Sequence, residues 1–337
     1  MASDAVPAGA LSRRRFIHIS AAASGLSLVP LTRAAKAEAQ LVTWRGATLG
    51  AVATLQIHHH DRAAAERLVG RAVAEARRLE RVFSLYRDDS ALSALNRHGV
   101  LAAPPPELVQ LLDECRRYWE LTEGAFDPTV QALWVLYREH FLKPDADPGG
   151  PTRGALAETL AKVGMQHVAS GADRILLRRR GMGLTLNGIA QGYVTDRIAD
   201  MLRAEGVDRT LVDMGETRAL GARPDGHPWQ VAVTDSDAPE RPAEALQIVD
   251  QAVATSAPGG FRFDAAGRCN HLFDPRSGVS ASLYRSVTVV MPTATAADAL
   301  STAFSLMPAD RIKAALRAAG GGLVLLLDAT GKSLVKA

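Results

Sequence analysis

This chain of 337 residues contains little cysteine, few aromatic residues and little excess charge. Its only two cysteines, Cys115 and Cys269, fall in different predicted elements; the sequence leaves open whether they form a bridge and favours two free thiols. After the N-terminal segment, no stretch reaches the length of a transmembrane helix. The formal charge is only +3, and part of it lies in that segment, so no nucleic-acid-binding surface is predicted.

Two nucleotide-binding signatures are also missing. No Gly-x-Gly-x-x-Gly follows a predicted strand, and no Walker-type lysine loop occurs, which disfavours a Rossmann or P-loop fold. With 47% hydrophobic and 22% charged residues, the composition is typical of a folded globular protein. Behind the N-terminal segment remain roughly 300 residues, enough for one large domain or two small ones.

The N-terminus has the pattern of an export signal. Three consecutive arginines begin at Arg13, a mildly apolar run rich in Ala and Ser follows, and an Ala-x-Ala site occurs at 35–37 or 37–39. This arrangement resembles a bacterial twin-arginine signal. We therefore expect 1–39 to be the signal, 40–337 to be the mature domain and the protein to be periplasmic, with tethering to the inner membrane through an uncleaved signal as an alternative.

Apolar spacing predicts interspersed helices and strands in which hairpins dominate. The predicted helices cover 63–83, 107–122 and 189–205, with a further helix after Pro292. The predicted strands cover 42–58, 174–177 and 182–186 (as a hairpin), 210–219, 230–234, 247–254, 270–273, 286–291 and 323–328. Such a pattern favours an α+β fold over a doubly wound parallel sheet.

Asp298 and Thr302 are the first candidate site residues. The strand 286–291 ends at Pro292 and a helix begins after it, so residues four apart project from one helical face. A carboxylate and a hydroxyl at that spacing are hard oxygen donors that suit Mg²⁺. On its own such a pair is usually solvated or capping, so the metal interpretation depends on the other motifs.

Further motifs each have an ordinary structural interpretation. Read separately, these motifs are explained by helix caps, turns and tight helix–sheet packing. They are the Ser-x-Tyr bend at 84–86, Gly-Ala-Phe-Asp-Pro-Thr at 124–129, Asn-Gly-Ile-Ala-Gln-Gly-Tyr at 187–193 and His-Leu-Phe-Asp-Pro at 271–275. In this order, with the helix at 297–302, they resemble the ApbE family of FAD:protein FMN transferases. The resemblance extends from Val42 to the C-terminus, and the forms Leu-Asn-Gly-Ile-Ala-Gln-Gly-Tyr and Val-Asp-Met-Gly-Glu resemble its NosX branch.

The resemblance implies an α+β fold with a T-fold-like core and an FAD site between subdomains. It implies cleavage of the FAD pyrophosphate, attachment of FMN through a phosphoester to a Ser or Thr hydroxyl of an acceptor protein, release of AMP and a requirement for Mg²⁺. The acceptor implied by the branch is NosR, a membrane flavoprotein that supports nitrous oxide reduction. Two alternatives remain: a non-enzymatic FAD-binding or flavin-delivery protein, and a Mg²⁺-dependent FAD pyrophosphatase.

Site residues follow from the resemblance position by position. The matching metal ligands are Asp298, Thr302 and the backbone carbonyl of Gly188. Tyr86 matches the aromatic residue that packs against the flavin. Other matching FAD contacts are Leu49, Gly124, Ala125, Phe126, Thr185, Gln191 and Phe273. His271 is expected to transfer a proton or bind phosphate, and Asp298 is the alternative proton acceptor.

Four positions depart from the commoner family pattern. Gln191 replaces Lys or Glu, Thr185 replaces Asp, Ala257 replaces the glycine of a Thr-Ser-Gly, and Glu216 replaces the second of two paired glycines. Because the metal positions are intact, we expect these changes to affect flavin recognition rather than the class of reaction.

Two polar runs are predicted to be structural. His58-His59-His60 is the polar end of a strand rather than a transition-metal site, because consecutive strand residues point to opposite faces. The three arginines at 178–180 are the solvated tip of a hairpin rather than a nucleic-acid patch.

Overall fold

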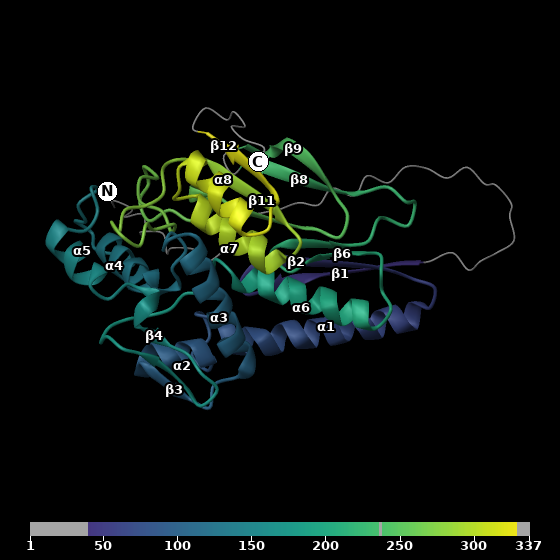
Figure 1. The fold of residues 1–337 in the computed structure, drawn as a ribbon, viewed down its shortest axis with the longest axis horizontal. Helices are drawn as coiled ribbons and strands as arrows, with labels where there is room; N and C mark the ends of the chain where they lie inside the picture. The colour runs from purple at the N-terminus through teal and green to yellow at the C-terminus, as the bar shows by residue number, and fades with distance from the viewer. Residues whose placement is uncertain (1–39, 236–237, 329–337) are drawn as a thin grey trace, which may run out of the picture.

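The computed structural model describes residues 40–235 and 238–328, so the predicted export signal lies outside the described residues. A seven-stranded sheet runs through the molecule (Figure 1). Its strands, in spatial order, are β1 (Gln40–Thr48), β2 (Ala51–His59), β6 (Thr210–Asp213), β7 (Thr217–Leu220), β10 (Ala252–Ser256), β11 (Ser286–Met291) and β12 (Leu323–Leu327). All six pairings are antiparallel, which together with the helices confirms the predicted α+β class.

Helices cover one face of this sheet. They are α1 (Arg62–Phe83), α3 (Pro106–Leu121), α6 (Ala190–Ala204), α7 (Ala294–Phe304) and α8 (Ala309–Ala318). In Figure 1, α1 and α6 lie side by side beneath the strands. Apolar residues of α1 recur every three or four positions, as at Leu68, Ala72 and Leu79, and this buried stripe faces the main hydrophobic core.

The opposite face is covered by a β-hairpin of β8 (Trp229–Asp235) and β9 (Ala238–Ile248). Trp229 and Ile248 pack there against Val253 of β10, forming a second hydrophobic core. In β11, Val287 and Val289 contribute to the main core while Val290 contributes to the second. Both faces of β11 are therefore buried, which explains why its sequence is a continuous apolar run.

A smaller region flanks one end of the sheet. It contains α2 (Ala91–His98), a three-stranded sheet of β3 (Val100–Ala102), β5 (Arg174–Leu177) and β4 (Val168–Ala169), α4 (Gln131–Phe141), α5 (Arg153–Leu160), and the 3₁₀ turns η1 (Pro128–Val130), η2 (Met165–His167) and η3 (Pro258–Gly260). Aromatic rings of α4 and of the loop after η3 form a third core, with Tyr137 and Phe273 centroids 4.8 Å apart.

Four strand predictions are wrong in detail. Residues 182–186 form no strand, because both edges of β5 are occupied by β3 and β4. The predicted strand 210–219 is a hairpin, since Gly215 has φ +110° and reverses the chain. The predicted strand 247–254 is divided between β9 and β10, and 270–273 makes only isolated bridges.

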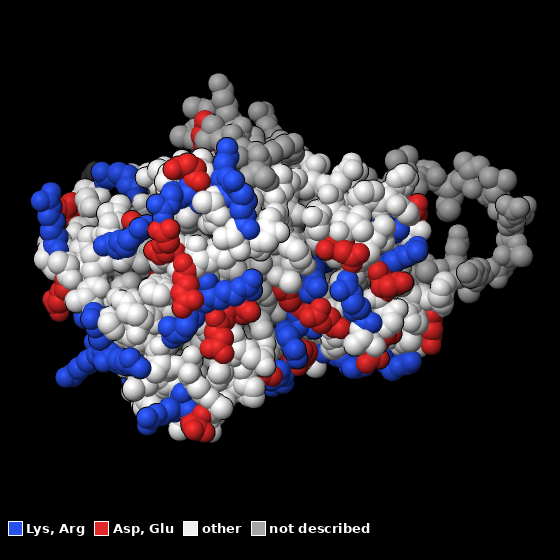
Figure 2. Space-filling model, in the orientation of Figure 1, with Lys and Arg blue, Asp and Glu red and all other residues white. Residues whose placement is uncertain are grey.

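The cysteine prediction is confirmed. Cys115 lies in the main core and Cys269 in the aromatic core, and both are buried free thiols. Within 40–235 and 238–328, no helix has the length and apolar character needed to cross a membrane. On the face shown in Figure 2, basic and acidic side chains are interspersed.

Candidate active site

The helix carrying Asp298 and Thr302 begins where the sequence predicts. Thr293 is its N-cap, and its side chain accepts a hydrogen bond from the backbone N–H of Ala296. Nearly all of α7 is buried, including Asp298, which is 4% exposed, while Thr302 is half-buried. The two oxygen donors therefore lie on one face of a helix held inside the molecule.

Asp196 of α6 fixes the start of α7. Its Oδ1 accepts the backbone N–H of Ala294 at 2.9 Å, and its Oδ2 accepts the N–H and the hydroxyl of Thr295 at 2.8 and 2.6 Å. Arg218 of β7 donates to Oδ1 at 2.8 Å and also to the more exposed Asp200. A buried carboxylate with this many donors locks the two helices and β7 together.

Gly192 holds the same two helices at close range. Its backbone N–H donates to Oδ2 of Asp298 at 3.0 Å. A Cβ at this position would lie 2.3 Å from the carbonyl oxygen of Ala294, so only glycine fits. This glycine of the 187–193 motif thus serves helix packing and the orientation of Asp298.

The three predicted metal positions come together in the fold. A Cβ on Gly188 would lie 2.7 Å from Oγ1 of Thr302, which shows how closely the backbone at 188 approaches that hydroxyl. The hydroxyl of Ser256 lies 3.4 Å from Oγ1 of Thr302 and 2.8 Å from Oγ of Ser301. The backbone of Gly188 therefore lies against the Thr302 hydroxyl, one helical turn from Asp298, and we refer to these three positions as the oxygen cluster.

This donor set fits a hard divalent cation. Among the described residues, no Lys, Arg or His forms an ion pair with Asp298, although it is buried. Within residues 40–235 and 238–328, no group of three or more His, Cys, Asp or Glu side chains is placed to hold a metal ion. A carboxylate, a hydroxyl and a carbonyl, completed by phosphate or water oxygens, are the ligands that Mg²⁺ takes.

Two further buried carboxylates lie in this part of the fold, and sequence reasoning did not assign them to the site. They are Asp213 and Glu216, on either side of the β6–β7 turn. Burial raises the pKa of Asp298 to about 7 and that of Asp213 to about 6. Burial, and then the charges of Asp298 and Asp213, raise the pKa of Glu216 well above its usual range. The sequence contained one signal for this carboxylate, namely that Glu216 follows shortly after the apolar strand that begins at Thr210.

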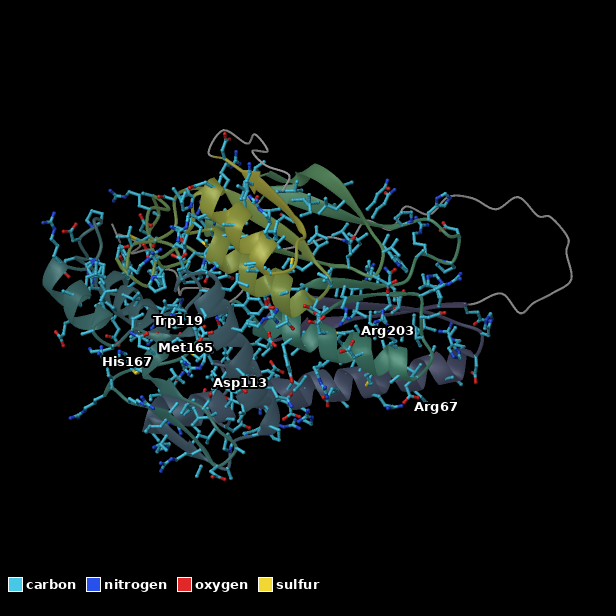
Figure 3. The ribbon with its side chains drawn as sticks, in the orientation of Figure 1. Arg67, Asp113, Trp119, Met165, His167 and Arg203 are labelled. Atoms are coloured by element: carbon cyan, nitrogen blue, oxygen red, sulfur yellow. The ribbon has the colours of Figure 1, made fainter. Side chains whose placement is uncertain are left out.

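Hydrogen bonds to Trp119, Thr129 and Met165 fix the conformation of the Gly-Ala-Phe-Asp-Pro-Thr segment at 124–129. Gly124 has φ +85°, and its N–H donates to the carbonyl of Trp119 at 2.7 Å. Asp127 accepts hydrogen bonds from the N–H and hydroxyl of Thr129, from the N–H of Met165 at 3.0 Å and from the Trp119 side chain. Trp119 and Met165 are labelled in Figure 3. Asp127 therefore positions the turn that carries the predicted flavin contacts.

Two of the predicted flavin positions, Tyr86 and Thr185, lie at or beside residues 185–187, next to Gly188. Asn187 donates to the Tyr86 hydroxyl at 3.5 Å, and Tyr86 is 60% exposed. The N–H of Thr185 donates to the carbonyl of Pro128 at 2.7 Å, which joins this segment to the 124–129 motif. Tyr86 is thus an accessible aromatic residue whose hydroxyl lies beside Asn187, the residue before Gly188.

The remaining predicted contacts differ in accessibility. Ala125, Phe126 and Phe273 are buried, and Phe273 packs in the aromatic core. Leu49 lies in the β1–β2 turn with φ +46°, and the Gln191 side chain lies against Gly215. Their roles toward a flavin stay predictions.

His271 is oriented by the loop that follows η3. Its Nδ1 lies 3.2 Å from the carbonyl oxygen of Phe261, and because a carbonyl only accepts, the proton is assigned to Nδ1. Burial lowers the pKa of His271 below 6.5, so the ring is neutral at neutral pH. Its Nε2 then carries a lone pair that can accept a proton.

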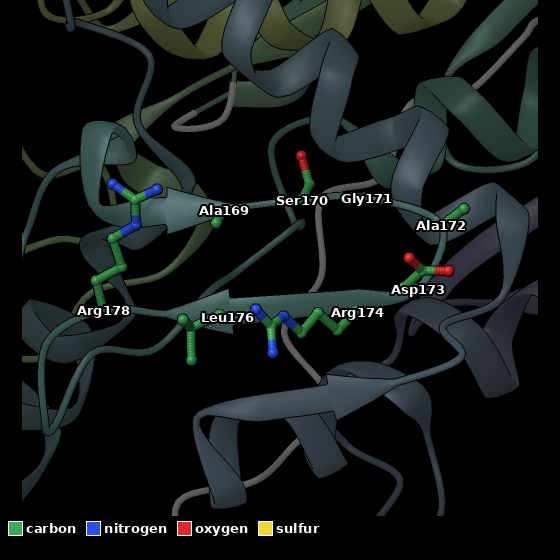
Figure 4. A pocket seen from close by; sticks show the side chains of 8 residues that line it. All are labelled: Ala169, Ser170, Gly171, Ala172, Asp173, Arg174, Leu176 and Arg178. Carbon is green, nitrogen blue, oxygen red and sulfur yellow. The ribbon is translucent and has the colours of Figure 1, made fainter.

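A surface hollow lies elsewhere, along the connection between β4 and β5 (Figure 4). Its lining residues are Ala169, Ser170, Gly171, Ala172, Asp173, Arg174, Leu176 and Arg178. None of the predicted site residues lines it, so we do not assign it to the candidate site.

Known proteins resemble this chain over most of its length. A profile of the ApbE family matches residues 49–326. The chain is 32% identical to an FAD:protein FMN transferase of Treponema pallidum (strain Nichols) over 262 residues, 71% of this chain and 70% of the relative. It is 28% identical to one from Klebsiella pneumoniae (strain 342) over 295 residues, covering 84% and 83%.

Solved structures agree with this comparison. The apo form of the Pseudomonas stutzeri flavinyl transferase ApbE superposes with a TM-score of 0.73 at 26% identity, covering 88% of this chain and 95% of that one. An ApbE protein from Thermotoga maritima gives a TM-score of 0.77 at 26% identity, covering 88% and 97%. The family match, the sequence relatives and the shared fold agree: this chain belongs to the ApbE family.

Proposed function

We propose that this chain is a Mg²⁺-dependent FAD:protein FMN transferase that acts in the periplasm. Its relatives over more than two thirds of the chain are FAD:protein FMN transferases, which supports an enzyme of this class. The observation that carries the proposal is the cluster of Asp298, Thr302 and the Gly188 backbone, in which a buried carboxylate that forms no ion pair among the described residues lies near two further oxygen donors.

The reaction joins FMN to a hydroxyl oxygen of the acceptor protein. That oxygen forms a bond to the phosphorus on the FMN side of the FAD pyrophosphate. The bond from this phosphorus to the bridging oxygen breaks, and AMP leaves with the bridging oxygen. The hydroxyl proton must pass to a base, so the products are the flavinylated protein, AMP and one proton.

The chain's own residues supply binding and proton transfer. The Tyr86 ring offers an exposed surface on which the flavin stacks. The neutral ring of His271, held through Nδ1, accepts the hydroxyl proton at Nε2. Asp298, Thr302 and the Gly188 carbonyl would hold Mg²⁺, and a bound Mg²⁺ would neutralise negative charge on the phosphates. Asp298 then serves as a ligand rather than as the base.

The acceptor proposed here is a NosR-like membrane flavoprotein, with a role in nitrous oxide reduction. Support comes from the forms at 186–193 and 212–216, which resemble the NosX branch. The twin-arginine pattern within 1–39 supports a periplasmic location, and an uncleaved signal would give peripheral membrane association.

An acceptor assay tests this function. The purified protein is mixed with FAD, Mg²⁺ and the periplasmic domain of a NosR-like protein, and the acceptor is analysed by mass spectrometry. We expect the added mass of FMN, with AMP released, and loss of both with EDTA or in Asp298→Ala. AMP and free FMN without labelling would indicate a pyrophosphatase, and intact bound FAD would indicate a carrier.

A further inference from the structure

We propose that Glu216 supplies an additional carboxylate to the divalent cation held by Asp298 and Thr302. This inference rests on the proposed function, because it assumes a cation at that cluster. It adds a residue at a position where the commoner family pattern has glycine. Glu216 would make the cation site of this chain more negative and tighter than the three matching positions alone provide.

The first observation is an unsatisfied buried carboxylate. Glu216 is only 6% exposed, and its Oε2 has no hydrogen-bond partner among the described residues. The carboxylate accepts one hydrogen bond, from the backbone N–H of Thr255. Leaving a carboxylate oxygen without water, donor or cation inside a protein is costly, so such an atom indicates a missing partner.

The second observation is the charge around Glu216. The charged groups that act on it are Asp298 and Asp213, and both are acidic. Asp196 in the same part of the fold shows the contrast, because its carboxylate is paired with Arg218 and saturated by donors from α7. In the part of the chain that the structure describes, neither Glu216 nor Asp298 forms an ion pair with a basic side chain, and a divalent cation between them would provide the missing positive charge.

The third observation is the position of Glu216 relative to the oxygen donors of the cluster. The Thr195 hydroxyl donates to the backbone carbonyl of Glu216 at 2.9 Å, which fixes the residue against α6. Thr255, which binds the Glu216 carboxylate, is followed by Ser256, whose hydroxyl lies 3.4 Å from Oγ1 of Thr302. Glu216 is therefore tied through adjacent residues of β10 to the oxygen cluster already described.

A purely structural role for Glu216 makes the opposite prediction. If the group is a neutral carboxyl that only fills space, an amide of the same shape replaces it with unchanged cation affinity. If it faces a bound cation, the amide removes charge where the cation needs it. The isosteric variant Glu216→Gln separates these interpretations, because its side-chain oxygen can still accept the Thr255 N–H.

The experiment measures Mn²⁺ binding by electron paramagnetic resonance, first without nucleotide and then with FAD. It compares the unmodified protein with Glu216→Gln, Asp298→Ala and a control, Glu205→Gln, which removes an exposed carboxylate paired with Arg71. We expect Glu216→Gln to bind Mn²⁺ about 10- to 100-fold more weakly, the range typical of residues that support a metal site. Glu205→Gln should bind as the unmodified protein does.

Thermal unfolding provides a second readout, because a variant that fails to fold would also lose Mn²⁺. In the metal-free state, Glu216→Gln should melt at the same temperature as the unmodified protein or higher, since an amide of the same shape replaces a buried carboxyl group whose Oε2 has no hydrogen-bond partner among the described residues. Added Mn²⁺ should then raise its melting temperature less than it raises that of the unmodified protein.

The outcomes distinguish this inference from the proposed function. Loss of Mn²⁺ binding in Asp298→Ala, with unchanged affinity in Glu216→Gln, overturns the role of Glu216 and leaves the proposed metal site intact. No Mn²⁺ binding by the unmodified protein, with or without FAD, overturns both. Weaker binding in Glu216→Gln with an intact fold supports the inference.

Discussion

Replacement of Asp196 by alanine tests how the start of α7 is held. The change leaves the guanidinium of Arg218, which is 8% exposed, without its buried partner, and it removes the acceptor for Ala294 and Thr295. Removing one member of a buried ion pair typically costs about 3–5 kcal/mol. Because Arg218 keeps its bond to Asp200, we expect a loss of unfolding free energy near the lower end, about 3 kcal/mol.

Urea unfolding at neutral pH measures this loss, and Asp200→Asn is the matched control. The Asp200 side chain is largely exposed, so its pair with Arg218 should contribute less than about 1 kcal/mol. Asp196→Asn, which keeps one acceptor oxygen, should lie between the two. Equal, small losses for Asp196→Ala and Asp200→Asn would refute the argument that Asp196 fixes α7.

Three further changes test the site. Gly188→Ala should weaken Mn²⁺ binding by tenfold or more, because the added Cβ would displace the Thr302 hydroxyl, while the melting temperature changes little. Titration calorimetry would measure the affinity, and an unchanged affinity would refute this expectation. Gly192→Ala should lower the unfolding free energy by about 1–3 kcal/mol in urea, as its Cβ meets Ala294. With saturating Mg²⁺ to keep Asp298 ionised, FMN transfer should decline at a pH below the usual titration range of histidine, because burial lowers the pKa of His271; the same decline in His271→Ala would exclude this role.

Local sequence signals predicted the main elements well where one physical effect dominates. The strand 286–291 and the helix after Pro292 occur as expected, because an apolar run ends at a proline and Thr293 can cap a helix. Helix 63–83 is observed at 62–83, since its apolar stripe is long and regular. The strand predictions for 182–186 and 210–219 were wrong, because pairing and the turn at Gly215 depend on neighbouring strands.

Part of the candidate site was also accessible from the chain alone. The four-residue spacing of Asp298 and Thr302 placed both on one helical face, and the motif order pointed to the ApbE family before any contact was known. What the pattern could not provide was the approach of Gly188 to Thr302, which brings together residues more than a hundred positions apart.

The electrostatic character of the site depends on the tertiary structure. Asp196 and Glu216 look alike in the sequence, because each is an acidic residue beside a threonine and within two positions of an arginine. The fold pairs Asp196 with Arg218 and the start of α7, and it leaves Oε2 of Glu216 without a partner near Asp298. Periodicity, capping and motif spacing are local and can be read along the chain, whereas burial and charge pairing arise only when distant segments pack together and exclude water.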